Sequence, residues 1–176
     1  AEAADHVGMR LERDFSTIIQ ATEMHASAQV VFCDLELCEG SQPFLQRFPE
    51  GQRHRRLGAI VPASPASEPQ SVLSSLDQAA HWVCNELFPP LGHRLMTRDL
   101  TDPHKDATLC IDNHRIQRLV QQMRDRCEGM SRLLRRAVAA TNQQMRIRGC
   151  FVAATGIAGH MNKQAFCEGV VPMILD

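Results

Sequence analysis

The residues best suited to binding an anion lie in a glycine-rich turn, TGIAGHMNK at 155–163. The turn follows an apolar run at 150–154 that predicts a strand buried on both faces. Where a buried strand runs into glycines, backbone N–H groups are exposed to an anion. Lys163 would add a positive charge and His160 a proton donor. Neither the Walker A spacing nor the Gly-x-Gly-x-x-Gly spacing is present. The candidate site for an anionic metabolite is Thr155, Gly156, Gly159, His160 and Lys163, and the alternative is a purely structural turn.

Two His/Cys pairs have spacings that suit a metal ion, His81-x2-Cys84 and Cys110-x3-His114. On a helix these spacings put both side chains of a pair on one face, so the two pairs together would complete a tetrahedral zinc site. Against this, Cys110 and His114 straddle a helix start predicted at Asp112. With eight His and seven Cys in 176 residues, such pairs also arise by chance. The alternative is that the cysteines belong to the core and the histidines lie near the surface.

The seven cysteines also permit Cys/His dyads for nucleophilic catalysis, but no local signature selects one. Their odd number and their position in apolar runs favour free thiols in a reducing compartment, and hence the cytoplasm. The segment DPHKDATLCIDNH at 102–114 either lines a pocket or connects two helices.

The positive charge of the chain is concentrated between residues 112 and 148, where nine arginines stand against three acidic residues. This segment carries +6 and the remainder −7, within a net charge of −1. The arginines outside the apolar stripe predict a solvated ribbon that would grip phosphates of nucleic acid or phospholipid, or pair with acidic groups elsewhere in the chain. The absence of aromatic residues between 89 and 150 argues against single-stranded nucleic acid. The ribbon consists of Arg115, Arg118, Arg132, Arg136 and Arg146.

Hydrophobic periodicity in the first half of the chain predicts a helix over 5–24 and a strand over 28–37. Glycines and prolines predict a loop over 38–56, followed by a second short strand at 57–61. The PASPASEPQ stretch at 62–70 predicts a flexible loop, which ends in a capping box that opens a helix. We expect Pro89 and Pro90 to stop that helix, and residues 91–105 have no clear pattern.

The second half is dominated by an apolar stripe over 112–147, which predicts one helix or two segments broken at Gly129, with Gly149 just past its end. The run 150–154 is then a buried strand. The final run, 169–175, is expected to be an edge strand because Pro172 cannot donate to a ladder.

This order of elements predicts an α+β fold, a small mixed sheet of about three to five strands covered by long amphipathic helices. A mainly helical bundle with short strands is the alternative. We expect residues 1–176 to form a single globular domain without a membrane span. Because the chain starts at Ala1, we expect it to be either excised from a longer protein or processed.

Three functions are compatible with these features. The first is a regulatory or interaction domain, in which the long Arg-rich helix associates with a protein partner or a second copy. The second is a small α/β enzyme or ligand-binding domain that holds an anionic metabolite at 155–163. The third is a domain stabilised by zinc.

Overall fold

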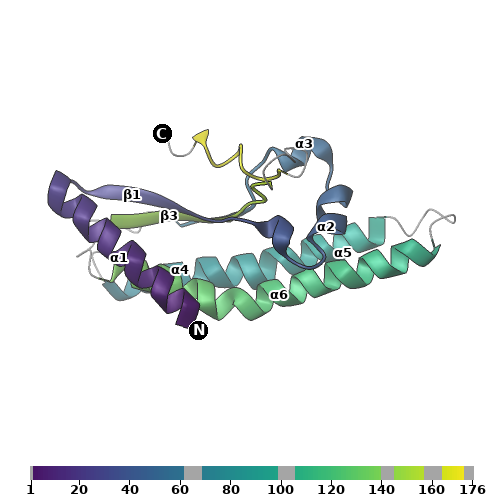
Figure 1. Ribbon diagram of the computed structural model, residues 1–176, viewed down its shortest axis with the longest axis horizontal. Coiled ribbons are helices and arrows are strands. Elements are labelled where there is room, and N and C mark those ends of the chain that lie inside the picture. Colours follow the sequence, from purple (N-terminus) through teal and green to yellow (C-terminus); the bar gives the residue numbers. More distant parts are fainter. Residues whose placement is uncertain (1, 62–68, 99–105, 140–144, 157–163, 173–176) are drawn as a thin grey trace.

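A computed structural model describes residues 2–61, 69–98, 106–139, 145–156 and 164–172. Long helices form one layer and a three-stranded mixed sheet lies over them (Figure 1). The predicted α+β class is therefore confirmed. The first predicted helix is confirmed as α1 (Glu2–Thr22). No helix in the described part of the chain is both long and apolar enough to cross a membrane.

The sheet has the strand order β1-β3-β2. β1 (Ala26–Phe32) pairs with β3 (Met145–Val152) in parallel, and β2 (Gly58–Ile60) pairs with β3 in antiparallel. β2 confirms the second predicted strand. The first predicted strand was placed too late, because Asp34 adopts a left-handed conformation (φ 62°) and residues Leu35–Leu37 form a 3-10 turn, η1.

The long predicted helix is continuous through Gly129, but its bounds differ from the prediction. α6 (Asp106–Val138) starts six residues earlier, and residues 145–147 belong to β3 instead. Met145 and Ile147 are buried while Arg146 between them is exposed, which is the alternation of a strand. Met145 and Ile147 also fit the spacing of the helical apolar stripe. Periodicity alone therefore assigned them to the helix instead of the strand. Gly149 does not end a helix but lies inside β3, where the Phe151 ring leaves no room for a Cβ.

The predicted loop over 38–56 is wrong, because it contains α2 (Ser41–Arg47) and α3 (Glu50–Arg53). Pro43 falls in the first turn of α2, where a missing N–H costs little. Phe44 and Leu45 of α2 are buried. Burial of these two side chains stabilises a helix whose glycine- and proline-rich flanks resemble a loop.

Pro89 and Pro90 do not stop the preceding helix. α4 (Pro69–His81) continues directly into a π-helical turn, η2 (Trp82–Leu87), and then into α5 (Phe88–Arg98). The prolines are the second and third residues of α5. The wider π turn before them accommodates two residues that lack an N–H donor, so the chain keeps its helical direction.

The predicted edge strand at 169–175 is also wrong where the structure describes it. Residues 169–171 form a turn and Pro172 is helical, whereas 173–175 lie outside the described residues. Gly169 packs against the backbone of Arg55 and Arg56, and Val170 is buried. This close packing, rather than a strand ladder, fixes the segment.

α6 is the central element of the helical layer. It contacts α1 on one side and α2, α4, α5 and η2 on the others, with further contacts to β3. The apolar stripe of α6 therefore belongs to the core, which the sheet covers through Cys150 and Val152. The fully buried members of the stripe are Ile116, Leu119 and Leu134.

Candidate functional site

The predicted glycine turn begins at the carboxyl ends of β1 and β3, and its first two residues do bind a carboxylate. The backbone N–H of Thr155 donates to Glu36 Oε2 at 3.2 Å, and that of Gly156 donates to Glu36 Oε1 at 2.6 Å. Thr155 Oγ1 also donates to Asp34 Oδ1 at 2.8 Å. Gly156 has φ 81°, which turns its N–H toward the same acceptor as that of Thr155. The turn is therefore a nest for an anion, and the anion is the chain's own Glu36.

The remaining predicted anion ligands, Gly159, His160 and Lys163, lie outside the described residues. Glu36 is 120 residues before Gly156 in sequence. No local pattern around either residue indicates the pairing, which arises because parallel strands bring their carboxyl ends to the same edge of a sheet.

Glu36→Ala is expected to lower the free energy of unfolding by about 1–3 kcal/mol, because it leaves two partly buried N–H groups without their acceptor. Urea denaturation followed by circular dichroism measures this change. Glu39→Ala is the matched control, since Glu39 forms an ion pair with Arg118 at 3.5 Å and half of its side chain is exposed. An equal loss in both variants would contradict the role of Glu36.

The structure does not bring the four predicted zinc ligands together. Cys84 Sγ lies 3.5 Å from Met130 Sδ of α6, whereas Cys110 is twenty residues earlier on the same helix, about 30 Å away at 1.5 Å per residue. His81, Cys110 and His114 are exposed, and Cys84 is fully buried. Among the described residues, no three His, Cys, Asp or Glu side chains are arranged to hold a metal ion.

Cys84 instead belongs to a buried sulfur-rich part of the core. Burial, together with the neighbouring Cys127 and Cys150, raises the pKa of the Cys84 thiol to about 12. Burial and the neighbouring Cys127 raise that of Cys150 to about 12 as well. Thiols with such pKa values stay protonated at neutral pH, so Cys84 and Cys150 behave as small apolar side chains.

Most arginines of α6 form ion pairs with acidic groups of the chain. Arg136 lies 2.9 Å from Glu12 of α1, and Arg118 lies 3.5 Å from Glu39. Arg132 and Arg115 pair within α6, with Glu128 and Asp112. Arg146 is not on the helix at all but on β3. Four of the five arginines that were predicted to bind phosphates therefore form ion pairs within the chain.

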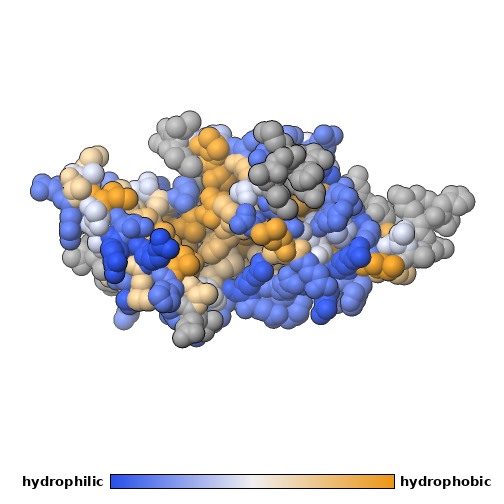
Figure 2. All heavy atoms as spheres, in the orientation of Figure 1, coloured by the Kyte–Doolittle hydropathy of each residue, from blue (hydrophilic) through white to orange (hydrophobic). Residues whose placement is uncertain are grey.

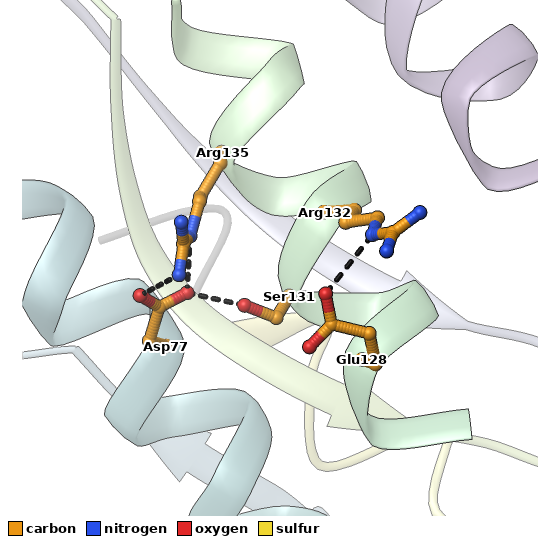
Figure 3. Close-up of polar contacts among 5 residues, drawn as sticks. All are labelled: Asp77, Glu128, Ser131, Arg132 and Arg135. Carbon is orange, nitrogen blue, oxygen red and sulfur yellow. Dashed lines mark hydrogen bonds and ion pairs between the residues drawn. The ribbon is translucent and has the colours of Figure 1, made fainter. Parts of the chain in front are cut away.

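The most elaborate of these contacts joins α4 to α6. Figure 3 shows Asp77 of α4 facing Ser131 and Arg135 of α6. Arg135 Nε donates to Asp77 Oδ1 at 2.6 Å, and Ser131 Oγ donates to the same oxygen. Burial alone would raise the pKa of Asp77, but the hydrogen bonds from Arg135 and Ser131 outweigh it and lower this pKa. The contact holds two helices in register.

An apolar groove opens on the face of the molecule where α1, β1 and α6 meet. Figure 2 shows this apolar area between the hydrophilic surfaces of the helices. The groove has a volume of about 490 Å³, and charged side chains of α6 form part of its wall. Its apolar lining consists of Ala3, Ala4, Phe32, Gly129, Met130 and Leu133.

β1 borders this groove and lies at the edge of the sheet. Among the described residues it pairs with β3 alone, so one side of its backbone has no strand partner. Its sequence, ASAQVVF, contains no charged residue and no proline. Proteins usually protect long edge strands with such residues, and an edge without them is a template for pairing with another strand. The absence of charge in 26–32 is visible in the sequence, but the edge position is not.

α1 adds a third apolar surface beside the groove. Val7, Leu11 and Ile18 fall within about 40° of one another around the helix axis, on the flank that also carries Ala3 and Ala4. Val7 and Ile18 are 47% and 46% exposed, so neither α6 nor the sheet covers this flank. The β1 edge, the groove and this flank of α1 thus lie next to one another.

The described part of the chain thus has an α+β fold in which β1 has a strand partner on one side only. Comparisons of the chain with protein-family models, with curated protein sequences and with solved structures found no match. The geometry and chemistry of the described residues are therefore the support for the proposals below.

Proposed function

We propose that this chain is an interaction domain that binds a protein partner by adding a strand to β1. The observation that carries the proposal is the seven-residue, uncharged edge of β1. In strand addition, main-chain hydrogen bonds provide affinity and adjacent apolar pockets select side chains. The groove beside Phe32 supplies such a pocket.

The location of this interaction differs from the one expected from the sequence. The apolar stripe of α6 packs against α1, α2, α4 and α5, and most of its arginines form ion pairs within the chain. The partner would therefore contact the β1 edge and only the part of α6 that lines the groove.

The alternative function, an anionic metabolite held at 155–163, has less support. The two N–H groups at the start of the turn donate to Glu36, so an incoming anion would have to displace a carboxylate. Asp34 adds a second negative charge nearby, which opposes the approach of an anion.

A display library of random heptapeptides tests strand addition directly. We expect the selected peptides to lack proline and to alternate apolar with polar residues, because a strand on β1 presents one face to the groove. Their binding, measured by fluorescence anisotropy, should be at least tenfold weaker for Val31→Pro. The carbonyl of Phe32 accepts from Ala153 of β3, so by alternation the N–H of Val31 points away from β3. Proline at 31 therefore removes a donor from the open edge only.

Ile111→Lys is the control, because Ile111 is an exposed apolar residue at the start of α6, far along the helix from the groove. Circular dichroism verifies that both variants are folded. Peptides that bind wild type and Val31→Pro equally would overturn the proposal.

A further inference from the structure

We infer that the partner of β1 is a second copy of this chain, with the two β1 strands antiparallel about a two-fold axis at Gln29. The inference rests on the proposed function, in which a partner strand pairs with β1. It goes further by identifying that partner strand as β1 of a second copy. Symmetric pairing of one surface with itself is the commonest arrangement of soluble dimers.

The sequence of β1 is complementary to itself in this register. Around Gln29, Ala28 lies opposite Val30, Ser27 opposite Val31, and Ala26 opposite Phe32. Every pair joins a small residue of the first half of the strand to a larger residue of the second half. Cross-strand neighbours of this kind fill the surface without collision. Since β1 carries no charge, the two-fold axis brings no like charges together.

The backbone directions fit the same register. The carbonyl of Phe32 accepts a hydrogen bond from Ala153 of β3. Because neighbouring residues of a strand direct their backbone groups to opposite sides, residues 27, 29 and 31 direct their N–H and C=O groups away from β3, toward the open edge. With the axis at Gln29, the residues of one copy that point to the open edge lie opposite such residues of the other copy. Ser27 lies opposite Val31, and Gln29 lies opposite Gln29 of the second copy. These pairs are the hydrogen-bonded pairs that an antiparallel ladder needs.

Gln29, the residue on the two-fold axis, has a side-chain oxygen without a hydrogen bond in the described part of the chain. Its Oε1 is buried and has no hydrogen-bond partner among the described residues. Buried polar atoms are nearly always satisfied, and an orphan one requires an explanation. In this structure the Oε1 lies over Gly149 of β3, in the space that a Cβ of residue 149 would fill. On the axis the two Gln29 side chains would be cross-strand neighbours on one face of the sheet, and each would have to rotate away from Gly149 for the amide of one to donate to the Oε1 of the other.

The helical layer continues the interface. α1 contacts α6, and its residues Ala3 and Ala4 line the groove together with Phe32 of β1, so the two-fold axis would bring α1 of one copy near α1 of the other. The exposed flank with Val7 and Ile18 would then be covered. Burial of apolar area in both layers supplies the free energy that a lone strand pair lacks. The two three-stranded sheets would then form one six-stranded sheet, with the helices of both copies on the same face of it.

Sedimentation equilibrium of the purified chain over a wide concentration range tests the inference. We expect wild type to reach twice the monomer mass with a concentration-dependent equilibrium. Val31→Pro removes an outward N–H, and Val31→Lys brings a positive charge into each Ser27–Val31 pair. Each should weaken the dimer by at least tenfold, whereas Ile111→Lys should leave it unchanged. Two Val31 variants guard against one that fails to fold, which circular dichroism detects.

Amide hydrogen exchange adds a readout at single residues. In the dimer the N–H groups of Gln29 and Val31 should exchange more slowly than in the dilute monomer, because they become donors in the new ladder. A chain that stays monomeric throughout, or a dimer that persists in both Val31 variants, would overturn the inference. If the wild type is monomeric but still binds the selected heptapeptides through β1, the proposed function stands. Only the second copy as the partner is then rejected.

Discussion

Gly40→Ala is expected to lower the free energy of unfolding by about 3–5 kcal/mol. Gly40 has φ 83°, a conformation that side chains other than that of glycine rarely adopt. An added Cβ would also lie 1.9 Å from the carbonyl oxygen of Arg115 in α6. Because this obstacle is backbone, only a displacement of η1 and α2 away from α6 relieves it. Urea denaturation measures the loss.

Gly51→Ala is the matched control for that variant. Gly51 lies in α3 and has no atom within 4 Å of the position of an added Cβ. Since alanine is also the better helix former, Gly51→Ala should be neutral or stabilising by up to about 1 kcal/mol. A Gly40→Ala variant as stable as Gly51→Ala would mean that α2 does not approach α6 as closely as the structure shows.

Phe44→Ala is expected to cost about 3–5 kcal/mol. Phe44 is completely buried, and its ring centroid lies 5.7 Å from that of Phe88 and 5.5 Å from that of Phe48. Truncation leaves a cavity between α2 and α5 that rigid neighbouring helices cannot fill by collapse. The cost would appear in the midpoint of urea unfolding, monitored through the single tryptophan, Trp82.

Leu37→Ala serves as its control, because Leu37 is an apolar side chain in the neighbouring η1 that is 67% exposed. Its replacement should change stability by no more than about 0.5 kcal/mol. If Phe44→Ala were as mild as Leu37→Ala, residues 41–47 would be the surface loop that the sequence predicts and not an anchoring helix.

Several elements could be predicted from the sequence because their information is local. The amphipathic repeat of 5–24 gives α1, the body of 112–138 gives most of α6, and the apolar run 57–61 contains β2. In each, the spacing of apolar residues matches a single secondary structure, so no distant contact is needed to choose it. The α+β class follows from the order of these elements.

The surroundings of the candidate site residues depend on contacts between distant segments, which the sequence does not indicate. The glycine turn was predicted to hold an anionic metabolite, whereas the N–H groups of Thr155 and Gly156 donate to Glu36, which comes from η1. The spacing of His81, Cys84, Cys110 and His114 suggested zinc, yet the packing of η2 on α6 directs Cys84 to Met130 instead.

By itself the sequence determined that residues 26–32 carry no charge and that the long helix carries both an apolar stripe and an excess of arginine. Only the tertiary structure decided that β1 lies at the edge of the sheet and that the arginines mostly pair with carboxylates inside the chain. Local patterns fix which face of an element avoids water, because that depends on the spacing of its own side chains. Which surface remains without a partner depends on where all the other elements pack.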